Sequence, residues 1–139
     1  MSEEHRGEVL VLNLVDYPGN PEKNDYAGRL VNGWAPWMDD ELVFTLNRWD
    51  RRFNAERALK CEHVLFTYEG TVKVVAHITG IFGPYPITRD DGREQSRCAV
   101  YGEVLTGGDP AYDYWHGRSD LPGTDNRIEY NYIPAVDYS

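Results

Sequence analysis

Residues 54–81 read NAERALKCEHVLFTYEGTVKVVAHITGI, and this stretch decides the fold class. His63–Tyr68 is rich in β-branched and aromatic residues, which is typical of a strand. Glu69 and Gly70 follow, and a glycine tolerates the positive φ that a tight hairpin needs. The stretch therefore predicts a β-hairpin closed by a two-residue turn or by a three-residue loop with a glycine bulge. Its return strand alternates in polarity, which places on one face Val72, Val74, Ala76 and Ile78.

Strand and helix patterns flank this hairpin on both sides. Glu8–Val15 is a nearly continuous apolar run of strand length, which predicts a buried first strand. A short helix is predicted from Pro21 to Val31, ended by Asn32 and Gly33. Asp39 is a candidate N-cap for a second helix, which either breaks near Asn54 or continues to Leu59. The apolar stripe of that helix is predicted to comprise Leu42, Leu46, Trp49 and Phe53.

The remaining third of the chain predicts further strands and long connections. Residues 83–93 contain two turn signals and predict an exposed connection. Ser96–Leu105 and Arg127–Ile133 are strand candidates, the first with a bulge at Gly102. The pattern predicts a single α+β domain over residues 1–139. Its expected architecture is a small, mostly antiparallel, partly open β-barrel of five or six strands, covered by two or three helices.

Composition limits the classes of function. The chain has 139 residues, 41% of them hydrophobic, with a net charge of −9 and a pI of about 4.8. This acidity argues against general adhesion to nucleic acid, although a local basic face is compatible with it. No apolar run approaches the roughly 20 residues that a membrane-spanning helix needs. With two cysteines and a polar N-terminus, the sequence predicts a reduced, cytoplasmic protein without membrane association.

Aromatic residues are the unusual part of the composition. The chain has ten tyrosines and four tryptophans, and several lie in segments that read as loops. Flat ligands such as nucleic-acid bases are held by stacking on such rings, and polar side chains then contact the edge of the base. The alternative is that these rings only cap the ends of a small core. The predicted ligand-binding residues are Asn32, Trp34, Trp37, Asn54, Tyr101 and Trp115.

A group of arginines lies in the second half of the second predicted helix and in its possible continuation to Leu59. If residues 39–59 form one helix, Arg48 and Arg52 project away from its apolar stripe, as contact with phosphates would require. The alternative is a solvated face neutralised by Asp50, Glu56 and Glu62. The predicted phosphate-binding residues are Arg48, Arg51, Arg52 and Arg57.

Evidence for catalysis or metal binding is weak. The four candidate metal ligands are Cys61, His63, Cys98 and His116, but they lack the CxxC spacing of a zinc knuckle. No sequence motif of a hydrolase, a P-loop protein or a dinucleotide-binding protein is present. His77 lacks an orienting partner that the spacing identifies. The sequence therefore predicts no catalytic residue, no metal and no cofactor.

Part of the chain resembles EVE domains and their PUA-like relatives. The similar residues are Asn54–Lys60, the strand His63–Tyr68 with its preceding Glu62, Gly70, and Val72–Ala76, together with the apolar first strand and the tryptophan-bearing loop after it. The resemblance covers residues 8–82. The chain differs in having Glu62 and His63 where the family has Gly-Asp, and it lacks the GxKxxExR signature of the related ASCH group.

The resemblance implies a PUA-like barrel that binds nucleic acid and holds a modified base in an aromatic pocket. By this resemblance Asn32, Trp34 and Trp37 would line the pocket, whereas Tyr101 and Trp115 lie beyond the matching motif. Our leading hypothesis is a non-enzymatic module that binds RNA or DNA and accepts a flipped or single-stranded base. One alternative is an acidic protein-interaction module whose surface imitates nucleic acid. Another is a small-molecule-binding enzyme that uses His77 or the aspartates of the loop after Thr106.

Overall fold

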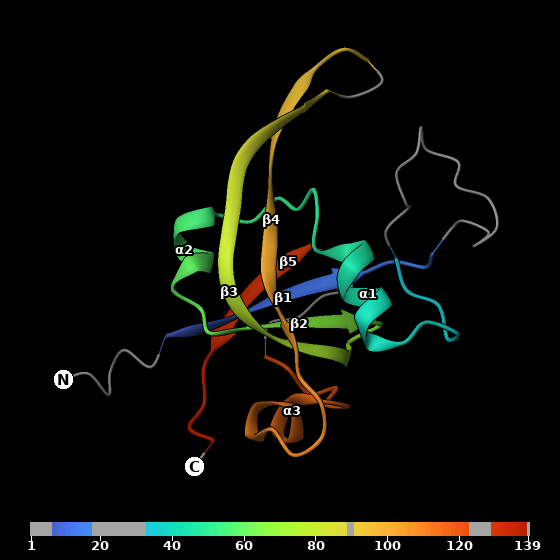
Figure 1. Cartoon of the computed structure of the whole chain (residues 1–139), viewed down its shortest axis with the longest axis vertical. Helices are drawn as coiled ribbons and strands as arrows, with labels where there is room; N and C mark the ends of the chain where they lie inside the picture. Colours follow the sequence, from blue (N-terminus) through green and yellow to red (C-terminus); the bar gives the residue numbers. More distant parts are fainter. Residues whose placement is uncertain (1–6, 18–32, 89–90, 123–128, 139) are drawn as a thin grey trace.

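The computed structural model describes residues 7–17, 33–88, 91–122 and 129–138 of the chain. These residues form an α+β protein in which three short helices accompany a curled, mixed sheet of five strands, a half-barrel (Figure 1). The elements in chain order are β1 (Glu8–Leu14), α1 (Asp40–Asn47), α2 (Ala55–Leu59), β2 (His63–Tyr68), β3 (Thr71–Thr88), β4 (Glu94–Val104), α3 (Pro110–Trp115) and β5 (Tyr130–Pro134).

The sheet has the strand order β4-β3-β2-β1-β5. Pairing is antiparallel at β1–β5, β2–β3 and β3–β4, but β1 and β2 run parallel. The prediction of a mostly antiparallel sheet is therefore only partly confirmed. A parallel neighbour requires a crossover, and the segment between β1 and β2 supplies it together with α1 and α2.

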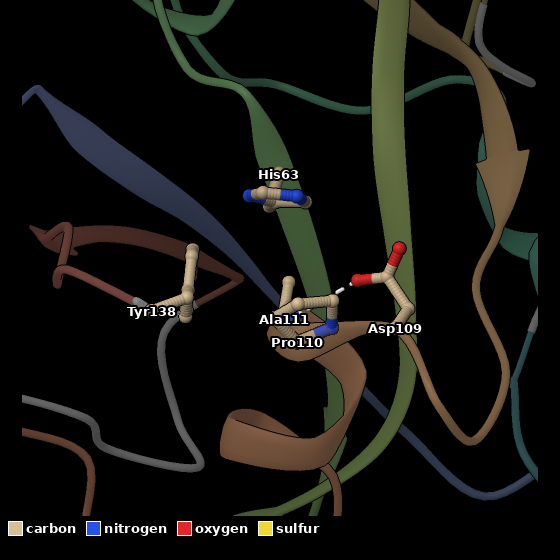
Figure 2. A pocket seen from close by; sticks show the side chains of 5 residues that line it. All are labelled: His63, Asp109, Pro110, Ala111 and Tyr138. Atoms are coloured by element: carbon tan, nitrogen blue, oxygen red, sulfur yellow. Dashed lines mark hydrogen bonds between the residues drawn. The ribbon is translucent and has the colours of Figure 1, made fainter.

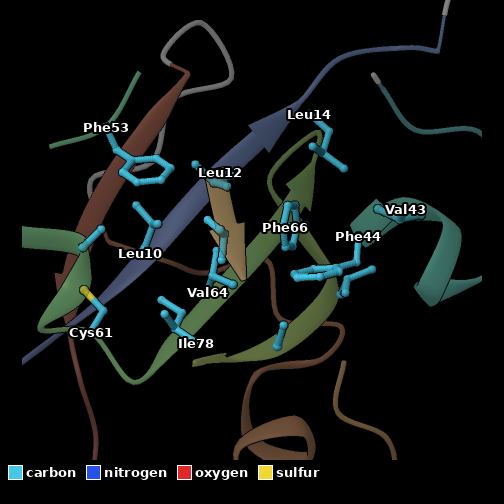
Figure 3. Close-up of a cluster of buried hydrophobic side chains, with 14 of the residues drawn as sticks. Leu10, Leu12, Leu14, Val43, Phe44, Phe53, Cys61, Val64, Phe66 and Ile78 are labelled. Atoms are coloured by element: carbon cyan, nitrogen blue, oxygen red, sulfur yellow. The ribbon is translucent and has the colours of Figure 1, made fainter. Parts of the chain in front are cut away.

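The neighbouring strands β1 and β2 are buried on both faces of the sheet, which explains their nearly continuous apolar sequence. On one face, Leu10, Leu12, Val64 and Phe66 belong to a cluster that also contains residues of α1 and α2 (Figure 3). We call this the α1–α2 cluster. On the other face, Val9, Val11 and Leu65 belong to a second cluster with Ala111 and Trp115, which we call the α3 cluster.

The hairpin β2–β3 forms where it was predicted, but its register contains a bulge. Glu69 (φ 50°) and Gly70 (φ 83°) make a two-residue turn in which both residues adopt a backbone conformation with positive φ. The pairing shifts between Phe66 and Thr67, because Phe66 faces Val74 whereas Thr67 faces Val72. The extra residue in β3 moves Val72 to the α3 cluster, so its predicted place on one face with Val74 is wrong.

The second predicted helix ends well before Asn54. Asp39 does cap α1, and its side chain accepts a hydrogen bond from Leu42 N. The helix stops at Asn47. The N–H of Arg48 still donates to Phe44 O of α1, but its C=O accepts a hydrogen bond from Val100 N of β4. Because the helix is broken, Trp49 leaves the predicted apolar stripe and is 39% exposed.

The segment that follows α1 runs along the outer edge of β4. Arg51 and Cys98 exchange both backbone hydrogen bonds, at 2.8 and 2.6 Å, and Val100 N donates to Arg48 O at 2.9 Å. Segment 48–51 therefore pairs with β4, which would otherwise be a free edge of the half-barrel at this level.

Residues 83–88 continue β3 as a strand and do not form the predicted exposed connection. They pair with the start of β4, from Tyr85–Arg97 to Thr88–Glu94. Together β3 and β4 extend past the rest of the sheet as an arm (Figure 1). A register shift between Phe82 and Tyr85 accompanies Gly83, whose φ is 122°.

The remaining predictions of structure have mixed outcomes. The predicted helix from Pro21 to Val31 lies outside the described residues. The long segment after Thr106 was predicted as a loop but contains α3, which Asp109 caps. The shift near Gly102 places the extra residue on β3, between Ile78 and Gly80. In the described part of the chain, no helix is long and apolar enough to cross a membrane.

Candidate functional site

Trp34, the first predicted ring of the base pocket, is partly buried and is already stacked on another aromatic ring of the protein. Its ring lies on that of Tyr68, with centroids 4.5 Å apart and planes at 29°. Lys73 Nζ lies 4.7 Å from the same indole centroid. The backbone before Trp34 is fixed as well, because Gly33 has a φ of 134° and a Cβ there would lie 2.6 Å from Tyr17 Cα. A base could stack on Trp34 only where these neighbours leave its ring open.

The other predicted pocket residues are spread over the molecule. Trp37 is 51% exposed and meets the ring of Tyr17 edge-on at 5.7 Å. Asn54 caps α2, where its side chain accepts from Arg57 N at 2.9 Å. Trp115 is 4% exposed within the α3 cluster, on the opposite face of the sheet from Trp34. The structure therefore does not bring Trp34 and Trp115 together, and Asn32 lies outside the described residues.

The four predicted phosphate-binding arginines do not form one face. Arg51 is 4% exposed, and its guanidinium lies 3.9 Å from Glu129. Burial lowers the pKa of Arg51, while the nearby Glu129 opposes this shift. Arg52 is exposed and lies 3.3 Å from the same carboxylate. Because Arg51 is enclosed, it is poorly placed to meet a phosphate from solution.

Arg57 has an acidic partner that is distant in sequence. Its guanidinium makes two hydrogen bonds to the Glu8 carboxylate, at 2.6 and 2.5 Å, and lies 4.1 Å from the Tyr132 ring centroid. The bond from Arg57 lowers the pKa of Glu8. The predicted neutralisation of arginines by acids therefore occurs, but through Glu8 and Glu129.

Two predicted site residues, Arg48 and Tyr101, do come together, and they do so around Trp49. The guanidinium carbon of Arg48 lies 3.9 Å from the Trp49 ring centroid and 4.9 Å from that of Tyr101. The two rings are 6.2 Å apart at 76°. Trp49 and Tyr101 are 39% and 42% exposed, so the stacked cation lies at the surface. Arg48 Nη1 is held by a hydrogen bond to Val100 O at 3.2 Å.

A third exposed ring, Phe82, extends this surface along the paired strands β3 and β4. Phe82 pairs with Ala99, and Tyr101 pairs with Gly80, so both rings are on one face at diagonal positions of adjacent strands. Phe82 is 50% exposed and its ring lies 5.3 Å from that of Tyr85. Gly80 places no side chain opposite Tyr101. We call Arg48, Trp49, Phe82 and Tyr101 the aromatic–arginine surface.

The segment carrying Trp49 is fixed to the arm by a reciprocal pair of hydrogen bonds. Asp50 N donates to Tyr85 Oη at 2.8 Å, and Tyr85 Oη donates to Asp50 Oδ1 at 2.7 Å. Burial and the bond to Asp50 raise the pKa of Tyr85 to about 12, so the phenol stays protonated at neutral pH. Asp50 has a φ of 59°, which is uncommon outside glycine. The surface is therefore preorganised by contacts that are far apart in sequence.

A shallow pocket of about 280 Å³ lies elsewhere, next to α3 (Figure 2). It is lined by His63, Asp109, Pro110, Ala111 and Tyr138, which we call the histidine pocket. The imidazole of His63 meets the ring of Tyr138 at 90° and 5.5 Å. Burial lowers the pKa of His63, against the opposing effect of the negative charges of Glu62 and Asp109. The imidazole is therefore neutral at physiological pH.

The four candidate metal ligands are dispersed. Cys61 and Cys98 are buried in the α1–α2 cluster, whereas His63 lines the histidine pocket and His116 stacks on Tyr112. Burial raises the pKa of Cys61 to about 11, so its thiol is not a reactive thiolate. Within the described ranges, no group of three or more potential ligands is close enough to hold a metal ion.

Trp49 and Phe82 were not selected from the sequence as site residues, and Asp109 was considered only among the loop aspartates of the enzyme alternative. Trp49 fitted a helical stripe, and Phe82 preceded a segment with the composition of a loop. A signal was present in Asn54, a strong N-cap that indicates a new helix start and hence a break before it. Asp109 followed by Pro110 is likewise a helix-start signal.

The chain is thus a small α+β protein with a curled mixed sheet, which carries the aromatic–arginine surface and the histidine pocket. Compared with models of protein families, with curated proteins and with solved structures, the chain matches none.

Proposed function

We propose that the chain is a nucleic-acid-binding module that holds one or two unpaired bases on the aromatic–arginine surface. The observation that carries this proposal is the guanidinium of Arg48, which lies over the rings of both Trp49 and Tyr101 at the protein surface. Proteins that bind single strands combine exposed rings with arginine in this way, and each stacked base contributes about 1–3 kcal/mol.

The geometry favours unpaired bases as ligands over the paired bases of a nucleic-acid duplex. The three rings lie on adjacent strands and their flanking segment, and two of them are at least 42% exposed, Phe82 and Tyr101. A paired base presents only its edge, whereas an unpaired base exposes the face that such rings stack on. Because Gly80 leaves the space beside Tyr101 open, a planar ring can approach Tyr101 from the β3 side.

Charge limits the form that this binding takes. The chain carries a net charge of −9, so long-range attraction to a polyanion is unfavourable. Arg48 is a partly exposed cation within the surface, whereas Arg52, four residues further along the chain, is exposed but faces Glu129. One or two phosphate contacts predict a shallow salt dependence, with a slope of about −0.7 to −1.4 for single strands.

The PUA-like, EVE-type assignment belongs to this proposal. It is supported by the buried first strand, the β2–β3 hairpin and the curled sheet. In the proposal the base contacts move from the predicted Trp34–Trp37 loop to the aromatic–arginine surface, because Trp34 is stacked on Tyr68.

Fluorescence anisotropy with labelled single-stranded DNA and RNA oligonucleotides tests the proposal. Trp49→Ala and Tyr101→Ala are each expected to weaken binding by about 5- to 150-fold, the equivalent of one stacked base. Tyr101→Phe keeps the ring and should bind as the wild type does. Gly80→Val adds bulk beside Tyr101 without removing a ring and should also weaken binding.

Trp37→Ala is the matched control, because it removes an exposed tryptophan from a different part of the molecule. Loss of binding in Trp37→Ala with unchanged binding in Trp49→Ala would restore the pocket predicted from the sequence and refute the aromatic–arginine surface. Absence of any oligonucleotide binding by the wild type would refute the nucleic-acid proposal. Circular dichroism of each variant verifies the fold.

A protein partner is the second candidate, since tryptophan, tyrosine and arginine also dominate protein-interaction hot spots. The discriminating experiment is affinity capture from lysate with and without nuclease. A partner that survives nuclease and high salt, and is lost in Trp49→Ala, would assign the same surface to protein binding.

A further inference from the structure

The histidine pocket is built from three segments that are distant in sequence. His63 comes from the start of β2, Asp109 to Ala111 come from the start of α3, and Tyr138 comes from the segment after β5. Its volume of about 280 Å³ is just below the range of about 300–1,000 Å³ that is usual for small-molecule sites, so its ligand must be small. The pocket shares no residue with the aromatic–arginine surface, so it requires a separate explanation.

The walls of this pocket are held in place. Trp115 Nε1 donates a hydrogen bond to Tyr138 Oη at 2.5 Å, which orients the phenol ring. His63 is 8% exposed and packs between the rings of Tyr138 and His77. Ala111 is 2% exposed and forms the floor with Pro110. A ligand body would therefore meet apolar and aromatic surface that is already ordered.

The charge of the pocket is negative. Asp109 Oδ1 accepts a hydrogen bond from Ala111 N at 2.9 Å, as Figure 2 shows, and a carboxylate has further lone pairs on its second oxygen. Among the five residues that line the pocket, none is an arginine or lysine. His63 is neutral at physiological pH, and Glu62 adds a second negative charge within electrostatic range of it.

We propose that the histidine pocket binds a small molecule that carries one protonated amine on a compact aromatic or aliphatic body. The amine pairs with the free oxygen of Asp109, and the body packs against Pro110, Ala111 and the ring of Tyr138. A cation beside an aromatic face gains further stabilisation, and the net charge of −9 attracts cations to the protein.

Three probes that share one body test the charge requirement: benzylamine, benzyl alcohol and benzoate. Each is titrated into ¹⁵N-labelled protein, and amide chemical shifts are followed by NMR. Benzylamine is expected to shift the amides of His63, Ala111 and Tyr138 with saturation, the alcohol to bind at least about tenfold more weakly, and benzoate to leave these signals unchanged.

Asp109→Asn tests the assigned carboxylate without removing the helix cap, because asparagine caps helices as well as aspartate does. This variant should weaken benzylamine binding by at least about tenfold and leave benzyl alcohol binding unchanged. Asp39→Asn is the matched control, since Asp39 is also an aspartate N-cap, that of α1, and does not line the pocket.

Equal affinity for the three probes in the wild type would overturn the proposal, and this measurement does not depend on any variant. Unchanged benzylamine affinity in Asp109→Asn, or shifts confined to residues away from the pocket, would overturn it as well.

Discussion

Asn47 provides the most direct test of how the loop before α1 is held. Its side chain is fully buried and makes three hydrogen bonds. Oδ1 accepts from Gly33 N at 2.8 Å, and Nδ2 donates to Gly33 O at 2.9 Å and to Val43 O at 2.8 Å. A single amide thereby fixes the backbone that carries Trp34 onto the last turn of α1.

The cost of Asn47→Ala follows from these bonds. A buried donor left without a partner costs about 1–3 kcal/mol, and here Gly33 N–H loses its acceptor in a buried position. The two lost bonds from Nδ2 together add roughly 1 kcal/mol, and the small cavity adds roughly 1 kcal/mol more. We therefore expect the free energy of unfolding to fall by about 3–5 kcal/mol and Tm to fall by about 10–15 °C.

Urea denaturation followed by tryptophan fluorescence measures this loss, and hydrogen exchange at the Gly33 amide localises it. Asn54→Ala is the matched comparison, because Asn54 is an exposed N-cap whose removal costs about 1 kcal/mol. If Asn47→Ala cost no more than Asn54→Ala, or left exchange at Gly33 unchanged, the clamp described above would not hold the loop.

Three further predictions concern charged groups. Arg51→Met should leave the free energy of unfolding unchanged or raise it by up to about 2 kcal/mol in urea denaturation. The reason is that the buried Nε of Arg51 has no hydrogen-bond partner, and that Glu129 retains its ion pair with Arg52 in the variant. A loss above about 3 kcal/mol would contradict this prediction. Glu8→Gln should lower Tm more at pH 7 than at pH 3, because Arg57 lowers the pKa of Glu8. The stabilisation is complete above the ordinary value of 4.5 and is lost as the pH falls through the lowered pKa of the folded state. An effect at pH 3 equal to that at pH 7 would exclude the ion pair as its cause. Burial lowers the pKa of His63, so the unfolded chain binds the proton more tightly than the folded protein does, and stability should fall as the pH drops below 6.5. His63→Gln should flatten this part of a plot of Tm against pH. A curve for the variant that runs parallel to that of the wild type would refute the assignment to His63.

The parts of the fold that could be predicted are those set by neighbouring residues. The turn at Glu69 and Gly70 and the apolar run of β1 were correctly located, because turn chemistry and continuous burial leave local patterns. The same is true of Asp39, whose capping role is visible in the sequence. These features need no knowledge of distant partners.

The features that sequence reasoning missed depend on partners far along the chain. The parallel pairing of β1 with β2 is decided by the crossover and not by either strand. The bulge that moves Val72 to the α3 cluster changes the pairing of β2 with β3 at one point, and an alternating sequence gives no sign of it. The separation of Trp34 from Trp115 has the same reason, since the two residues lie on opposite faces of the sheet.

The early end of α1 connects the fold to the proposed function. Leu46 and Trp49 are spaced for one helical stripe, yet the backbone leaves the helix after Asn47 to pair with β4, and Trp49 turns outward beside Tyr101. The turn requires Asp50 at a positive φ, which a non-glycine residue adopts at a cost. A conflict between local pattern and final structure is most often tolerated where it places a functional residue. Asp50→Gly would relieve this strain and keep the backbone N–H bond to Tyr85 Oη, but it would lose the bond that Tyr85 Oη donates to Asp50 Oδ1.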